Sequence, residues 1–230
     1  MMLRDYIANN QSKLTNEVMD FYTPTGLHVY FQYPVEGVDV EKVIDKVESV
    51  LPLHLLNDIE MIIFGWFDEF EERSINAFYK DNAIYVSYLQ QDSADLYDDL
   101  LHEIAHSLEE AHGYQIYADE KIKKEFLRKR RYLHDILWKN GFKAPLSFFN
   151  NVEYDEEFDN FLYKKVGYDK LASMMSGLFI NPYAATSLRE YFATAFTEFY
   201  LDSNHQFLQK VHPAVYEKIS SLQTIKELDY

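Results

Sequence analysis

The segment DLLHEIAHSLEEAHGY contains the pattern HExxH, in which His102 and His106 are the two histidines. Residues i and i+4 of an α-helix lie about 40° apart around the axis, on neighbouring turns. If the segment is helical, both imidazole rings point toward one place beside the helix. This pattern constrains the fold, because two histidines do not hold a metal ion alone and another part of the chain must supply a third ligand.

The residues around the motif predict a buried helix. Apolar side chains recur at the spacing that such a helix needs, at Leu100, Leu101, Ile104, Ala105 and Leu108. The chain has no cysteine, so any metal must be held by histidines and carboxylates. We therefore predict one catalytic Zn²⁺ ion with His102 and His106 as ligands.

The residue between the histidines indicates the chemistry. Glu103 lies beside the rings, where its carboxylate can reach a water on the metal. A zinc ion with three protein ligands and one open position lowers the pKa of its water to about 7. Glu103 can then act as general base and pass the proton to a leaving amine. The pattern predicts hydrolysis of a peptide bond.

The third ligand has two kinds of candidate. His112 has the histidine spacing of the metzincin pattern HExxHxxGxxH, but an unbroken helix places it about 80° behind His102 and about 15 Å further along the axis. Gly113 follows His112 and is predicted to be a helix C-cap. The other candidates are acids in YAATSLREYFATAFTEFYLD (183–202). Glu190 is embedded in the apolar pattern of this helix, whereas Glu198 is two turns further on and expected to be exposed.

The composition indicates one folded domain. The 230 residues are 47% hydrophobic and 17% aromatic, which is enough for a substantial core. The formal net charge of −16 disfavours nucleic-acid binding, which needs a basic surface. No apolar run has the length of a membrane span and no secretory leader is recognised, so we expect a cytoplasmic protein with a peptide or protein substrate and no membrane association.

Periodicity predicts an α+β fold. Strands are expected in GLHVYFQYP (26–34), IEMIIFGWF (59–67) and, as a hairpin, INAFYKDNAIYVSYL (75–89); a helix is expected in VDVEKVIDKVESVL (38–51). Further helices are expected through HExxH, from about Asp119 to Asn140, and from about Ser187 to Leu201. We predict one catalytic domain over 1–230, with an α/β lobe over about 1–92 and a mainly helical lobe over about 93–230. The strand AIYVSYL (83–89) precedes the HExxH helix and is the expected edge to which a peptide can add.

Two short blocks resemble a known family. HEIAHSLEEAHGY, followed by Y-x6-E-Y-F-A-T-A-F, resembles the catalytic domain of the anthrax lethal factor-like metallopeptidases, a gluzincin group that includes the Pro-Pro endopeptidases. The resemblance covers about residues 83–220 and implies a zincin-like fold. By position it implies His102, His106 and Glu190 as zinc ligands, Glu103 as general base and Tyr183 as the residue that stabilises the oxyanion. Glu109 and Glu110 are candidates for orienting a ligand imidazole; the alternative is that one or both are solvated.

The sequence departs from this group between the two blocks. The interval from His106 to Glu190 is longer than expected, with the surplus inside about 122–180. Thr194 stands where some relatives carry an acid. The basic segment KIKKEFLRKRR (121–131) is interpreted as a solvated helix face, or alternatively as a docking patch for an acidic partner.

We therefore predict a zinc metalloendopeptidase. The alternatives are a non-catalytic, zinc-stabilised binding or assembly module, and a metzincin-type peptidase that uses His112. Glu103 and Tyr183 distinguish the first alternative from an enzyme, because a protein that only binds needs neither side chain.

Overall fold

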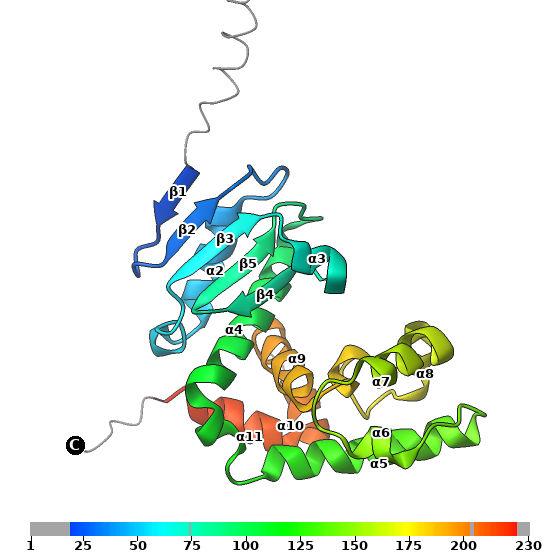
Figure 1. Cartoon of the computed structure of the whole chain (residues 1–230). Helices are drawn as coiled ribbons and strands as arrows, with labels where there is room; N and C mark the ends of the chain where they lie inside the picture. Colours follow the sequence, from blue (N-terminus) through cyan, green and yellow to red (C-terminus); the bar gives the residue numbers. More distant parts are fainter. Residues whose placement is uncertain (1–18, 74, 203–204, 225–230) are drawn as a thin grey trace, which may run out of the picture.

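A mixed five-stranded sheet forms one half of the molecule (Figure 1). The structure, a computed structural model, describes residues 19–73, 75–202 and 205–224. The strands are β1 (Met19–Tyr22), β2 (His28–Phe31), β3 (Met61–Gly65), β4 (Ala77–Lys80) and β5 (Ala83–Ser87). Their order is β1-β2-β3-β5-β4; the pairs β2–β3 and β3–β5 are parallel and the outer pairs are antiparallel. The edges of the sheet are therefore β1 and β4.

The predicted hairpin is confirmed as β4 and β5. Its two loop residues, Asp81 and Asn82, have φ values of 50° and 60°. Aspartate and asparagine tolerate this left-handed conformation better than most residues, which favours a two-residue turn between antiparallel strands. The turn fixes the register in which Lys80 faces Ala83.

Two helices cover one face of the sheet. These are α2 (Val40–Val50) and the long helix α4 (Ser93–Tyr117), which carries HExxH. Val43, Ile44 and Val47 of α2 are buried in one core with the central residues of the strands. The apolar side chains whose spacing predicted helices in 38–51 and in the HExxH segment are thus the ones that pack against the sheet.

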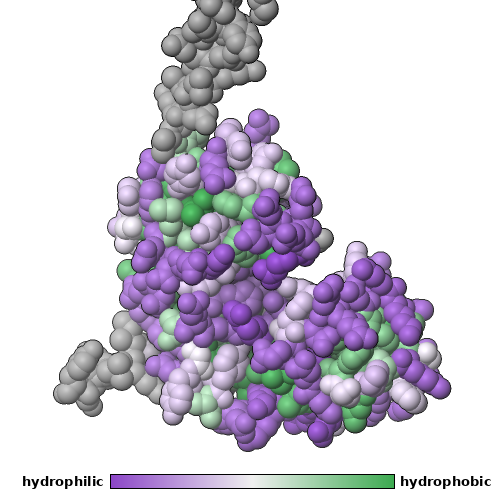
Figure 2. Space-filling model, viewed as in Figure 1, coloured by the Kyte–Doolittle hydropathy of each residue, from purple (hydrophilic) through white to green (hydrophobic). Residues whose placement is uncertain are grey.

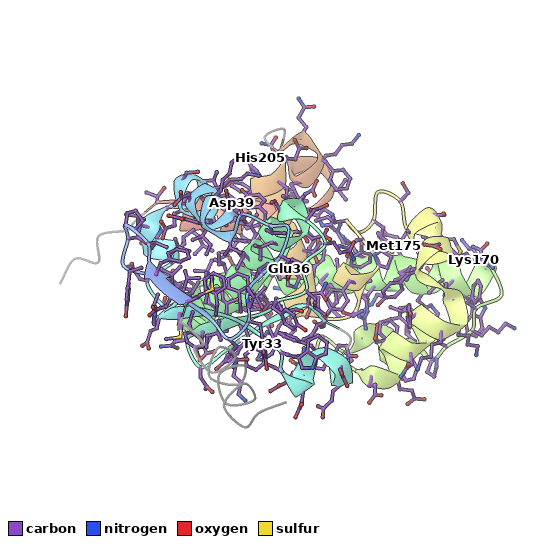
Figure 3. All side chains as sticks on the ribbon, turned by 90° about the horizontal axis from the view of Figure 1, so that it is seen from above. Tyr33, Glu36, Asp39, Lys170, Met175 and His205 are labelled. Atoms are coloured by element: carbon purple, nitrogen blue, oxygen red, sulfur yellow. The ribbon has the colours of Figure 1, made fainter. Side chains whose placement is uncertain are left out.

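The remaining elements are mostly short helices. They are α3 (Asp68–Arg73), α5 (Lys121–Lys139), α6 (Leu146–Asn150), α7 (Glu156–Asn160), α8 (Tyr168–Met174), α9 (Leu188–Leu201), α10 (Gln206–Val211) and α11 (Pro213–Leu222), with the single turns η1 (Leu53–Leu55), η2 (Phe161–Val166) and η3 (Tyr183–Ala185). Helices α5 to α8 lie in the long interval between His106 and Glu190. Helices α6 to α8 extend to one side of the molecule (Figure 1). Seen from above, Lys170 of α8 lies at one end of the molecule, away from Tyr33 and Glu36, which follow β2 (Figure 3).

The α+β class is confirmed at the level of a mixed sheet with many helices. All described strands precede α4, and the described chain after it is helical. One prediction about the sheet is wrong, because β5 lies between β3 and β4 and the edge beside α4 is β4. Strand β1 was not predicted, since its four residues are mostly exposed and show no clear alternation.

Helix α4 is longer than predicted. Asp92 caps its N-terminus, because its carboxylate accepts hydrogen bonds from the backbone N–H groups of Ala94 and Asp95. The helix is interrupted at His112, whose φ of −120° is not helical, and then continues to Tyr117. The predicted end of the helix at Gly113 is therefore close to an observed break one residue earlier, although Gly113 does not have the left-handed conformation of a C-cap glycine.

The basic segment of α5 does not form one continuous charged face. Lys129 and Arg130 are buried, and Lys121, Lys123 and Lys124 form ion pairs with neighbouring glutamates. In the part of the chain that the structure describes, no helix has the length and apolarity of a membrane span.

Candidate metal centre

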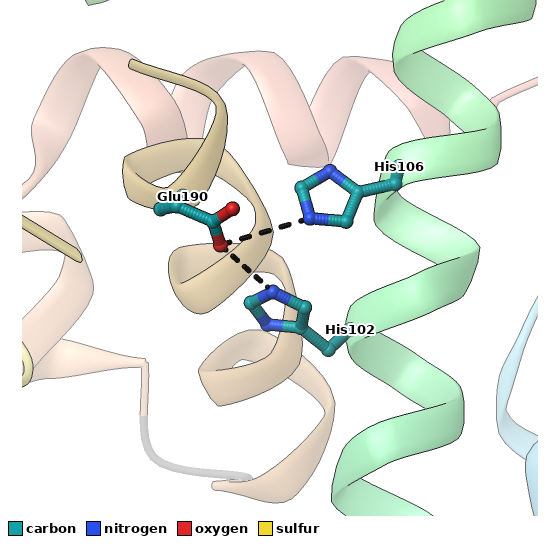
Figure 4. A group of neighbouring side chains, drawn as sticks. All are labelled: His102, His106 and Glu190. Atoms are coloured by element: carbon teal, nitrogen blue, oxygen red, sulfur yellow. Dashed lines mark hydrogen bonds and ion pairs between the residues drawn. The ribbon is translucent and has the colours of Figure 1, made fainter. Parts of the chain in front are cut away.

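Three predicted ligands meet where α9 crosses α4. His102 and His106 point from α4 toward Glu190, which lies in the first turn of α9 (Figure 4). The Oε2 atom of Glu190 is 3.0 Å from the Nε2 atom of His102 and 3.6 Å from the Nε2 atom of His106. Among the described residues, these three form the one group of histidine and acidic side chains whose ligand atoms all lie within 4.8 Å of one another.

The donor set fits a zinc ion. Ligand atoms that surround a tetrahedral zinc at bond lengths of about 2.0–2.1 Å are about 3.4 Å apart, close to the separations between Glu190 and the two imidazoles. Two imidazole nitrogens and a carboxylate oxygen are the donors of many zinc sites. The local sequence favours this placement of Glu190, because Ser187 caps α9 by accepting a hydrogen bond from the Glu190 backbone N–H.

The electrostatics of the group favour a cation. Burial alone raises the pKa of Glu190, but the interactions with His102 and His106 outweigh it and hold this pKa well below its usual range. Burial lowers the pKa of His106, but the hydrogen bonds to Glu109 and Glu190 prevail and raise it to about 10. A side chain that is 11% exposed therefore keeps its negative charge beside two ligand nitrogens.

Glu109 orients the ring of His106. Its Oε2 atom lies 2.7 Å from the Nδ1 atom of His106, which leaves Nε2 directed at Glu190. Tyr117 donates a hydrogen bond to the other carboxylate oxygen, and Arg189 donates one to Oε2 at 3.3 Å. An acid that holds the second nitrogen of a ligand imidazole is typical of metal sites. Glu110, the other candidate for this role, is exposed.

Glu103 is fixed by the edge strand. Its side chain is 7% exposed, and its Oε2 atom accepts a hydrogen bond of 2.8 Å from the backbone N–H of Tyr79 in β4. The carboxylate lines the same cleft as His102 and His106. The sequence placed Glu103 beside the histidines, but its backbone partner in β4 is a consequence of the tertiary packing.

Tyr183 lies next to the ligand residues. It begins the turn η3, and its ring centroid is 6.2 Å from that of His102. Burial, followed by the charge of Glu190, raises the pKa of Tyr183 well above its usual value. The hydroxyl therefore stays protonated at neutral pH and can donate a hydrogen bond into the cleft.

A cleft of about 450 Å³ gives access to these residues. Figure 2 shows a hollow with largely hydrophilic walls between the sheet half of the molecule and the helices beside it. The cleft is bounded by the end of α3, by β4, by the face of α4 around HExxH, by Tyr183 and by α9. The structure thus brings all five predicted site residues to one accessible place.

The alternative third ligands lie elsewhere. His112 faces Asp58, with 3.7 Å between its Nε2 atom and Oδ2 of Asp58, and is outside the ligand group. Glu198 lines the cleft but is also outside the ligand group, and it is half-buried rather than exposed as predicted. Thr194, between Glu190 and Glu198 on α9, lines the cleft as well.

Sequence reasoning missed two residues of the site. Tyr117 and Arg189 hold Glu109 from the end of α4 and from α9. The sequence offers a signal for Arg189, because this residue directly precedes the predicted ligand Glu190. Nothing in the sequence singles out Tyr117 among nineteen tyrosines. No protein-family model, no curated protein and no solved structure matches this chain.

Proposed function

We propose that this chain is a zinc-dependent endopeptidase of the gluzincin type, which hydrolyses peptide bonds in peptide or protein substrates. The observation that carries the proposal is that His102, His106 and Glu190 meet in a cleft that Glu103 and Tyr183 also line. His102, His106 and Glu190 would hold the metal. When bound, a zinc ion with three protein ligands lowers the pKa of a coordinated water to about 7 and polarises a carbonyl group.

Glu103 is the general base in this proposal. Its carboxylate takes a proton from the attacking water and passes it to the leaving amine nitrogen. The hydrogen bond from Tyr79 fixes the orientation of the carboxylate, so little reorganisation is needed during the proton transfer. Tyr183, protonated at neutral pH, donates a hydrogen bond to the developing oxyanion.

Strand β4 offers a place for the substrate backbone. The Tyr79 N–H points away from β5 to Glu103, so Ala77, two residues earlier, presents its backbone groups on the same outer side. Both residues line the cleft. An extended peptide that pairs with this edge lies alongside Glu103 and the ligand group.

The test combines metal content with cleavage. Zinc is measured by elemental analysis in the wild type, Glu190→Ala and His112→Ala after dialysis against a weak chelator, and cleavage is measured with a broad peptide library. We expect the wild type and His112→Ala to keep zinc and Glu190→Ala to lose it. Chelation should abolish cleavage by the wild type.

Glu103→Ala separates binding from catalysis. This variant should keep its zinc and lose at least about 100-fold in rate, the usual contribution of a general base. Loss of zinc from His112→Ala in place of Glu190→Ala would favour the metzincin alternative. A zinc-loaded wild type that cleaves nothing in the library would favour the non-catalytic binding module.

A further inference from the structure

One end of the cleft is acidic. Asp98 and Asp99 on α4 and Glu198 on α9 line it together with the ligand residues. Glu190 near the start of α9 faces His102 and His106, and Glu198, two turns later, interacts electrostatically with Asp98, which lies earlier on α4. The two helices therefore run antiparallel, and the three acids gather on the side of His102 away from His106.

These acids have no lysine or arginine partner in the described parts of the chain. Within the ranges 19–73, 75–202 and 205–224, no lysine or arginine forms an ion pair with Asp98, Asp99 or Glu198. The Oδ2 atom of Asp99 is buried without a hydrogen-bond partner. Burial, Asp98 and Glu103 raise the pKa of Asp99 to about 7, and burial, Asp202 and Asp98 raise that of Glu198. Placing like charges together in this way is unfavourable unless something positive joins them.

An independent observation comes from Thr194. It stands between Glu190 and Glu198 on the face of α9 that lines the cleft, and its side chain is 5% exposed. Its Oγ1 atom has no hydrogen-bond partner among the described residues. Buried hydroxyl groups in folded proteins are rarely unpaired. A ligand in the cleft that carries N–H donors would satisfy this hydroxyl and the neighbouring carboxylates.

The spread of the three carboxylates indicates which kind of cation fits the acidic end. Its three carboxylates do not form a group with all ligand atoms within 4.8 Å, as His102, His106 and Glu190 do within the described chain. They are therefore too dispersed for a single metal ion. A guanidinium or ammonium group on a long side chain carries several donors over a wider area and fits such a set.

Two arginines also line the cleft. Arg189 pairs with Glu109, which lies 11 residues beyond Asp98 on α4, about 16 Å along the helix. Arg73, at the end of α3, also lines the cleft. A peptide in the cleft thus meets unpaired carboxylates at the acidic end, and these attract a basic residue.

We infer that Asp98, Asp99 and Glu198 form a specificity pocket for a lysine or arginine side chain, so that the enzyme cleaves peptides at a fixed distance from a basic residue. This inference rests on the proposed endopeptidase function and names its substrate class. Thr194 forms the wall of the pocket on the side of the ligand group.

The test compares arginine with citrulline, which has nearly the same shape and no charge. Fluorogenic peptides carry one or the other at each position in turn, and kcat/KM is measured for the wild type, the double variant Asp98→Asn/Glu198→Gln and the control Glu157→Gln, an exposed acid on α7. We expect arginine to be preferred by about 10- to 100-fold at one position, the effect of one or two charge-assisted hydrogen bonds. The double variant should reduce this preference to about 3-fold or less, while Glu157→Gln behaves as the wild type.

A second readout separates this inference from the proposed function. Peptides with arginine or citrulline are titrated by fluorescence anisotropy into zinc-loaded Glu103→Ala protein, with and without the pocket substitutions. An arginine preference in binding that the double variant removes supports the pocket even if no peptide is cleaved. Equal binding and equal cleavage of the two peptide series, or a preference that survives the double variant, would overturn it.

Discussion

Glu109 shows how one side chain couples the ligand group to the rest of the protein. It holds the Nδ1 atom of His106 and is itself held by Tyr117 and Arg189. The ring of His106 is therefore fixed before any metal binds. Such preorganisation raises metal affinity, because less conformational freedom is lost on binding.

We predict that Glu109→Gln weakens zinc binding by about 10-fold. The amide can still accept a hydrogen bond from His106, but it no longer carries the charge that makes the imidazole a stronger ligand. Competition with a chromogenic chelator at pH 7.5 measures the effect. Glu110→Gln is the matched control, since Glu110 is the exposed next residue, and equal affinities in the two variants would contradict the assignment.

His212 is a second residue with a measurable consequence. It is fully buried, and burial followed by the charge of Lys129 lowers its pKa to about 3. Because the folded state keeps this imidazole neutral while the unfolded chain takes up a proton below about pH 6.5, its contribution to stability is complete above that pH and is lost as the pH falls toward 3.

We therefore expect wild type to lose stability relative to His212→Gln on acidification. Between pH 7.5 and pH 5 the difference in unfolding free energy should move by about 1–2 kcal/mol in favour of the variant. Urea unfolding at the two pH values measures it. A difference that stays constant would show that His212 titrates normally in the folded protein.

At the scale of elements, the site depends on how α9 crosses α4. Helix α4 carries two ligands and Glu103, whereas α9 contributes Glu190 and the face with Thr194 and Glu198. Strand β4 completes the cleft and holds Glu103 through the Tyr79 backbone. The turn η3, which carries Tyr183, must be held beside them.

Arg130 of α5 holds the end of this turn. Its guanidinium donates to the backbone oxygens of Ala185 and Thr186, just after Tyr183, and to those of Phe148 and Asn151 near α6. The side chain is 1% exposed. One residue from the interval between the two motif blocks thus joins α5 and α6 to the segment that leads into α9.

We predict that Arg130→Lys lowers the free energy of unfolding by about 2 kcal/mol. A lysine keeps the charge, but one ammonium group cannot reach all four carbonyl oxygens. Arg131→Lys is the matched control; Arg131 is exposed, so its replacement should change stability by less than about 0.5 kcal/mol. Similar urea midpoints for the two variants would contradict the role of Arg130.

At the scale of the molecule, a metal ion would link two distant parts of the chain. His102 and Glu190 are 88 residues apart in sequence and lie in different helices. The unfolded chain does not hold them together, so zinc binds the folded state preferentially and stabilises it.

We expect zinc to raise the melting temperature. At free zinc 100 times the dissociation constant the stabilisation is about 2.7 kcal/mol, which corresponds to about 5–10 °C for a chain of this length. Thermal unfolding of chelator-treated protein, with and without added zinc, measures it. Glu190→Ala should lose this response and Glu198→Gln should keep it; a wild type that does not respond would contradict the metal site.

The sequence by itself determined the local features of this protein. The spacing of His102 and His106, the apolar face of α4 and the hairpin turn at Asp81 and Asn82 all follow from helix and turn geometry over a few residues. The choice of Glu190 followed from its apolar surroundings and from a family resemblance. Its meeting with the histidines is then seen in the structure.

Only the tertiary structure decided which groups meet across long stretches of chain. It placed β4 rather than β5 at the edge, joined Glu109 to Tyr117 and Arg189, and gathered Asp98, Asp99 and Glu198 in one cleft. Periodicity cannot report these contacts, because it records which face of an element is buried but not which element covers that face. The packing of α9 and β4 against α4 supplies that information.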